Sequence, residues 1–138
     1  MKRDQGERDL QTLLKQMQPV LEEGDLVFCS LPPNQAEDYL SLCQGYVVEP
    51  EGITVIIGRS LADRNNLPYD LVFRRLSLMV HSSLDAVGFL ARITEILAAQ
   101  GISVNVVSGY YHDHLYIVES RAKEALKTLK LWQKKLSE

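Results

Sequence analysis

The sequence predicts an α+β fold of two tandem ferredoxin-like units with antiparallel sheets, preceded by an amino-terminal helix. Two observations lead to this prediction. Some segments have alternating or β-branched apolar residues, which are typical of strands. Between them lie segments with apolar residues at three- and four-residue spacing, which is typical of amphipathic helices. The order strand, helix, strand, strand, helix occurs over residues 25–66 and again over residues 71–136. Two strands joined by a helical crossover, with a hairpin strand slotted between them, form the split βαβ arrangement of ferredoxin-like folds.

The first predicted unit, residues 1–70, begins with an amphipathic helix over residues 10–17 that Pro19 ends. We expect strand, helix, hairpin and short helix to follow in that order. These elements are a strand at residues 26–31, a helix capped by Asn34, a hairpin over residues 45–57 that turns at Glu49-Pro50-Glu51-Gly52, and a helix within residues 60–66.

The second predicted unit, residues 71–138, ends in a helix and is therefore one strand short. Leu71 to Phe73 can complete the first unit, but the second must borrow a strand from its neighbour or from another subunit, or leave an open edge. Its predicted elements are a strand at residues 71–81, a helix at 86–100 with Asp85 as N-cap and Gly101 after its end, a hairpin with strands near 102–106 and 115–118, and a last helix capped by Ser120.

Composition and charge exclude several classes of protein. The 138 residues are 46% hydrophobic and 24% charged, as in ordinary globular proteins. The net charge of -3 disfavours a nucleic-acid partner, because such proteins need a basic surface. No apolar run reaches the roughly 18 to 20 residues that span a bilayer, and the amino-terminal segment lacks a signal-peptide core. We therefore expect a cytoplasmic protein without a membrane partner.

The sequence offers little that suits catalysis. Cys29 and Cys43 are isolated in apolar patterns, so we expect reduced thiols rather than a disulfide framework or a zinc site. Phosphate-binding loops, dinucleotide fingerprints and Gly-x-Ser-x-Gly elbows do not occur in the sequence. We therefore predict no catalytic residue and no cofactor, and we do not expect an enzyme.

The loop and helix of the second unit carry a family resemblance. The stretch from Asp85 to Ile93, followed by Ile96 to Val104, resembles the opening strand, loop, helix and strand of the ACT domain family. The match extends over residues Leu76 to Val118. Ala86-Val87 stands where the family pattern has a proline, and Ser103 stands where asparagine is common.

Nearly the whole chain is similar to small bacterial paired-ACT proteins of unassigned function, whose layout is similar to that of the paired-ACT arginine sensors of animal cytosol. The resemblance implies a regulatory module that binds an amino acid or another small ligand where two units meet. The segments that carry it are residues 17–21, 25–29, 49–54, 81–88 and 109–114.

The residues themselves suggest a ligand site at the end of the strand at 76–81. Helix N–H groups there can receive a carboxylate, and Gly88 lets a ligand approach the backbone closely. Asp85 can face an ammonium or guanidinium group, although it can equally serve as a helix cap, and Gly88 can equally serve tight packing. The candidate ligand-binding residues are Ser83, Asp85, Ala86, Val87, Gly88, Asn105, Val106, His112 and His114.

The alternative function is a metal-binding protein or metal-dependent enzyme built from His81, His112 and His114. We expect all the histidines at one end of the sheet, and residues two apart on a strand share a face. Asp113 should point to the other face. His112 and His114 can instead fix the hairpin by hydrogen bonding.

A homodimer is also expected. An unpaired sheet edge and a half-apolar outer face, with Met79, Val107 and Val118, need covering.

Overall fold

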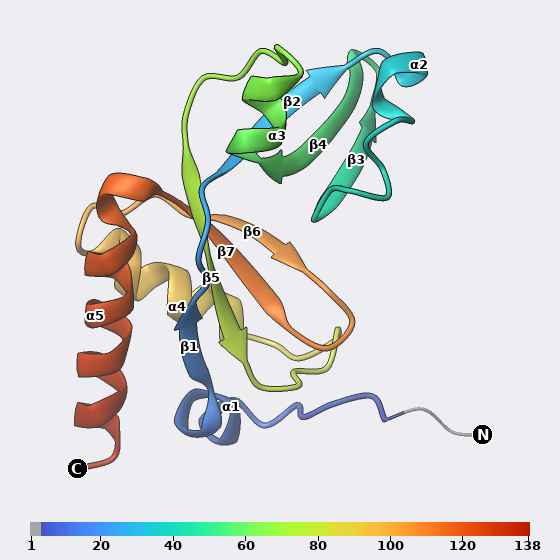
Figure 1. The fold of residues 1–138 in the computed structure, drawn as a ribbon. Coiled ribbons are helices and arrows are strands. Elements are labelled where there is room, and N and C mark those ends of the chain that lie inside the picture. Colours follow the sequence, from blue (N-terminus) through green and yellow to red (C-terminus); the bar gives the residue numbers. More distant parts are fainter. Residues whose placement is uncertain (1–3) are drawn as a thin grey trace. The chain divides into compact units, whose positions relative to one another are not determined.

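The computed structural model describes residues 4–138, which form two compact units (Figure 1). One unit is Glu23–Arg74. The other combines the described residues up to Glu22 with Arg75–Glu138. Each unit is an antiparallel sheet with helices, as the predicted ferredoxin-like fold requires.

The unit Glu23–Arg74 contains β2 (Leu26–Leu31), α2 (Pro33–Ala36), β3 (Gly45–Glu49), β4 (Gly52–Gly58) and α3 (Arg59–Arg64). β4 lies between β3 and β2, and both pairings are antiparallel. On the other side of β2, Leu26 pairs with Phe73 at the start of β5, as the fourth strand of this unit should. The core consists of Val27, Cys29, Leu31, Ala36, Val55, Ile57, Ala62 and Leu67.

The helix expected after Asn34 is shorter than its apolar spacing suggests, and it begins two residues earlier, at Pro33, so Asn34 is not its cap. Proline suits the first helical position because its missing N–H would have no partner there. α2 ends at Ala36 and the chain continues in turns, yet Tyr39 and Leu40 still pack against the core. The spacing therefore identified the buried face but not the length of the helix.

The other unit has the strand order β1 (Gln18–Leu21), β5 (Phe73–Met79), β7 (Asp113–Val118), β6 (Asn105–Ser108). β1 is the missing fourth strand, and the chain itself supplies it directly after α1 (Leu10–Gln16). It runs antiparallel to β5, with Pro19 opposite Leu78. An edge strand tolerates proline because it needs ladder bonds on one side only. Residues expected to lead the first unit thus complete the sheet of the second.

Helices α1, α4 (Phe89–Ala98) and α5 (Glu119–Leu136) contact one another in this unit, with α5 against β1 and β7 (Figure 1). The side chains between these helices and the sheet form one apolar core. Its buried members are Leu13, Leu14, Met17, Leu76, Leu78, Phe89, Ile93, Leu97, Ile102, Leu115, Ile117, Ala125 and Leu129.

The predicted caps of the two longer helices are also wrong. α4 starts at Phe89 with Gly88 as its N-cap, so Asp85 lies in the preceding loop. α5 starts at Glu119 with Val118 as its N-cap, two residues earlier than a Ser120 cap would place it. At the other end of α4, Gly101 has a φ of 72°, as expected of a glycine just beyond a helix. Among the described residues, no helix is long and apolar enough to cross a membrane.

Candidate functional site

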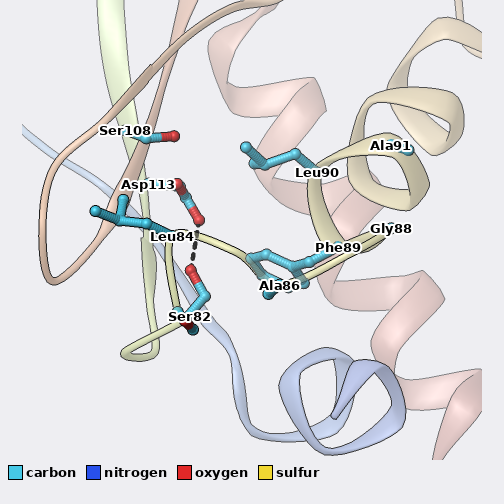
Figure 2. Close-up of a pocket in the computed structure, with 10 residues that line it drawn as sticks. Ser82, Leu84, Ala86, Gly88, Phe89, Leu90, Ala91, Ser108 and Asp113 are labelled. Atoms are coloured by element: carbon cyan, nitrogen blue, oxygen red, sulfur yellow. Dashed lines mark hydrogen bonds between the residues drawn. The ribbon is translucent and has the colours of Figure 1, made fainter. Parts of the chain in front are cut away.

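A pocket of about 160 Å³ lies at the amino-terminal end of α4 (Figure 2). Its walls come from the loop between β5 and α4, the first turn of α4, and the facing ends of β6 and β7. The lining residues are Ser82, Ser83, Leu84, Ala86, Gly88, Phe89, Leu90, Ala91, Ser108 and Asp113.

The residues of the first turn of α4 line this pocket, and their backbone N–H groups lie outside the hydrogen-bond ladder of the helix. The first bond of the helix ladder runs from the N–H of Arg92 to the carbonyl of Gly88, 3.0 Å away, so the N–H groups of residues 89–91 precede the ladder. Gly88 has a φ of 92° and makes no side-chain cap. A helix start of this kind attracts negative charge, because the N–H groups and the helix dipole both favour it.

A buried carboxylate lies in the same pocket. Asp113 is only 6% exposed, and its Oδ2 accepts a hydrogen bond of 2.9 Å from the hydroxyl of Ser82 (Figure 2). Asp113 is the first residue of β7, opposite Ser108 of β6. A carboxylate here can receive an ammonium or guanidinium group. Its role was missed from the sequence, although the alternation along residues 112–114 correctly put its side chain on the face opposite the histidines.

The predicted ligand residues divide into those that line the pocket and those that do not. Ser83, Ala86 and Gly88 line it. Val87 is 84% exposed and does not line it. Asn105 and Val106 start β6, whereas Ser108 at its other end meets the pocket. A strand rises about 3.3 Å per residue, which puts Asn105 roughly 10 Å from Ser108. The structure therefore does not bring these residues to the loop.

Asp85 belongs to a separate exposed cluster on the loop. Its Oδ1 accepts hydrogen bonds from the hydroxyl of Ser83 at 2.5 Å and from Nε of Arg8 at 2.8 Å. The hydrogen bond from Ser83, and next that from Arg8, hold the pKa of the Asp85 carboxyl below its ordinary value. Asp85 is thus ionised and paired with a residue far away in the sequence.

The described histidines make other contacts than those of a metal site. His81 packs against Tyr111, with ring centres 4.8 Å apart, and its Nδ1 lies 3.6 Å from a carboxylate oxygen of Asp4. His114 instead has Nδ1 2.8 Å from the hydroxyl of Ser77. Within residues 4–138, no three His, Cys, Asp or Glu side chains are placed to hold a metal ion. The structure therefore gives no support to the metal-site alternative.

His114 belongs to a polar network that ties β1 to β5 and β7. The buried hydroxyl of Ser77 donates to Glu22 at 3.1 Å, which leaves it to accept from Nδ1 of His114. Nε of Arg75 donates to the other oxygen of Glu22 at 2.5 Å. Burial, and next the charge of Arg75, hold the pKa of the His114 imidazole below its ordinary value. The ring is therefore neutral in the folded protein at neutral pH.

This network predicts a loss of stability in mild acid. The charged groups acting on His114 are Arg75, Glu22, His112 and Asp113, and their net effect together with burial favours the neutral ring. The unfolded chain thus binds this proton more readily, so the free energy of unfolding should fall as the pH drops below about 6.5 and through the folded pKa.

Urea titrations between about pH 7 and 5 measure the effect. His114→Gln should flatten the pH dependence in that range, because glutamine keeps a polar partner for Ser77 but does not titrate. Asn105→Gln, an exposed change on β6 that adds and removes no titratable group, is the control and should keep the slope of the natural protein. An unchanged slope in His114→Gln would show that another group is responsible.

Comparisons with known proteins now give the family. Models of the ACT domain match residues 5–74 and residues 74–130, and together they span almost the entire chain. The chain belongs to the ACT domain family. A search of curated proteins finds no match for it. The boundary between the two ACT matches lies at residue 74. In the structure, however, the described residues before Glu23 pack with Arg75–Glu138, the segment of the second match.

Solved structures also resemble this ACT protein. A protein of unknown function from Vibrio cholerae, described as a possible transport protein, is 39% identical with a TM-score of 0.80; the match covers 90% of this chain and 95% of that one. A protein from Agrobacterium tumefaciens is 16% identical, with a TM-score of 0.64 and coverage of 83% and 87%. The ligand-free regulatory subunit of aspartate kinase from Thermus thermophilus is 8% identical, with a TM-score of 0.65 and coverage of 86% and 97%. The last two likenesses show the fold alone.

Proposed function

We propose that the protein is a regulatory module that binds an amino acid in the pocket at the start of α4. ACT domains are regulatory modules that bind small molecules, often amino acids. The observation that carries the proposal is that one pocket combines the N–H groups at the start of α4 with the buried carboxylate of Asp113.

The two walls are complementary to the two charges that every amino acid carries. The α-carboxylate would lie against the N–H groups of residues 89–91, where the helix dipole favours an anion. The α-ammonium would lie against Asp113, whose carboxylate Ser82 already orients at 2.9 Å. A charged hydrogen bond is roughly twice as strong as a neutral one, so this pairing also favours charged ligands over neutral analogues.

The glycine at the N-cap allows the backbone turn with which α4 starts beside the pocket. A side chain at Gly88 would be strained at its φ of 92°, and its Cβ would lie 3.5 Å from Leu10. Ser83 and Ala86 are small residues at the same edge. These small residues leave room at this edge, while Leu84, Phe89 and Leu90 give the pocket apolar walls (Figure 2).

The test is a thermal-shift screen of the full chain against every proteinogenic amino acid, followed by calorimetry of each hit. A ligand at about a hundred times its Kd should add about 2.7 kcal/mol of stability, which gives a clear rise in Tm. If no amino acid of the panel raises the Tm and none gives heat in calorimetry, the proposal is refuted for amino acids.

A matched pair of variants tests the place of binding. Gly88→Ala should weaken the hit, whereas Gly101→Ala should leave it unchanged. Both glycines have positive φ and flank the same helix, but only Gly88 lines the pocket. Each variant is compared with its own ligand-free Tm, so that a loss of stability is not read as a loss of binding.

The homodimer expected from the sequence stays a prediction. Tyr46, Val47 and Val48 on β3, the last strand of its sheet, are more than half exposed. An edge of this kind can pair with another chain. Sedimentation velocity at micromolar concentration is the direct measurement, and a monomer would contradict the prediction.

A further inference from the structure

The segment Asp4 to Arg8, here called the arm, lies against the loop that forms the pocket. The N–H of Glu7 donates to the carbonyl of His81 at 2.8 Å, and the N–H of Ser83 donates to the carbonyl of Glu7 at 2.8 Å. Glu7 and Ser82 thereby form a parallel β-bridge. The arm is thus attached to the loop through main-chain groups on both sides of Ser82.

A glycine makes this close approach possible. Gly6 has a φ of +87°, and a Cβ placed on it would lie 2.8 Å from the carbonyl oxygen of His81 and 2.9 Å from the nitrogen of Ser83. Any side chain would therefore collide with the backbone of the loop as well as strain its own. Docking of the arm in this position requires glycine at residue 6.

Side chains hold the arm on either side of this bridge. Arg8 pairs with Asp85 at 2.8 Å, and the hydroxyl of Tyr110 donates to the carbonyl of Asp4 at 3.2 Å. The side chains of Arg8 and Asp85 are 54% and 69% exposed, so salt and water weaken the pair. The arm is therefore attached at few points, as expected of a segment that opens locally while its unit stays folded.

The same loop residues serve the arm and the pocket. Ser82 lies between the two main-chain bonds to Glu7, and its hydroxyl holds Asp113 in the pocket. Ser83 and Leu84 line the pocket and also line a second hollow, of about 260 Å³, on the side of the arm. The arm thus holds the backbone of Ser82 on both sides, and the hydroxyl of Ser82 contacts Asp113 from that position.

We propose that the arm is a strap whose docking is coupled to occupancy of the pocket, so that ligand binding holds the arm down and an empty pocket lets it open. The coupling rests on the proposed ligand-binding function. Since a docked arm orients Ser82 and Asp113, it favours binding, and by linkage the ligand favours docking by the same factor.

The docking itself is tested without ligand, by hydrogen exchange in the full chain. In Gly6→Ala the amides of Glu7 and Ser83 should exchange at least about tenfold faster, while those inside β5 keep their rates. Gly24→Ala is the matched control: its φ of +101° is also positive, but nothing lies within 4 Å of the added Cβ. Unchanged exchange at Glu7 and Ser83 in Gly6→Ala would overturn the strap.

A second pair of variants gives the same test without a change at glycine. Arg8→Gln removes the ion pair with Asp85, and Arg92→Gln removes an exposed ion pair of the same length, 2.8 Å, on α4. Only Arg8→Gln should speed exchange at Glu7 and Ser83. Equal exchange in both variants would show that Arg8 does not hold the arm.

The coupling is tested with the proteinogenic amino acids as probes, each added singly. One that binds should slow exchange at Glu7 and Ser83, and its Kd should rise about fivefold or more in Gly6→Ala and Arg8→Gln but not in the controls. A Kd that is equal in all variants would overturn the coupling and leave the binding function intact. Absence of binding to the natural protein would instead overturn both.

Discussion

Leu13→Ala should destabilise the packing of Arg75–Glu138, although Leu13 lies far from that segment in the sequence. Leu13 is fully buried and packs in the same core as Leu78, Ile93 and Leu129. Truncating a buried leucine removes apolar contacts and leaves a cavity, which costs about 2–5 kcal/mol. We therefore expect a loss of that size in the free energy of unfolding.

Urea unfolding measures the size of this loss, and hydrogen exchange shows where it occurs. Protection should fall in Arg75–Glu138 and persist in Glu23–Arg74. The control is Leu131→Ala on α5, because Leu131 is 51% exposed and its truncation should cost less than about 0.5 kcal/mol. A loss of protection confined to Glu23–Arg74 would assign α1 to the first ACT domain instead.

Asp113→Asn should weaken binding of the amino acid about 10- to 100-fold. A hydrogen bond to a charged group contributes about 1.5–3 kcal/mol, and asparagine keeps the size of Asp113 while removing its charge. Ser82 can still donate to the asparagine oxygen, so we expect little change in fold. Calorimetry with the hit from the amino-acid screen measures Kd, and the ligand-free Tm checks stability.

Two other carboxylates serve as comparisons for this experiment. Asp85→Asn changes the exposed carboxylate that the sequence suggested, and it should cost less affinity than Asp113→Asn because Asp85 does not line the pocket. Asp38→Asn, exposed in the other unit, should leave Kd unchanged. If Asp85→Asn has the larger effect, the ligand's cation lies outside the pocket at the start of α4.

The fold was largely predictable because its signals are local. The β-branched run around Val55 indicates a strand, and the apolar spacing within α4 indicates a helix, each within a few residues. The order of such elements along the chain then predicts the split βαβ arrangement. The ACT domain matches confirm this interpretation. Helix starts were less predictable, since Asp85 and Ser120 have good capping chemistry but Gly88 and Val118 precede the first helical turns.

The site was predictable only in part. A helix start after a strand indicated an anion-binding loop, and Ser83, Ala86 and Gly88 do line the pocket. Asp113 was assigned to the correct face of its strand but received no role, since nothing near it in the sequence indicates that Ser82 would lie opposite. The predicted use of the histidines as a metal site gains no support within residues 4–138, because His81 packs against Tyr111 and His114 pairs with Ser77.

The sequence by itself determined most of the strands and helices, their order, and the family they form, because periodicity and turn chemistry act over neighbouring residues. Only the tertiary structure decided which segments meet. β1 is four residues long and contains a proline, so its strand character comes from pairing with β5 rather than from local preference. The pairs Arg8–Asp85 and Ser82–Asp113 likewise join positions 77 and 31 residues apart, and such contacts exist only once the core has placed both partners.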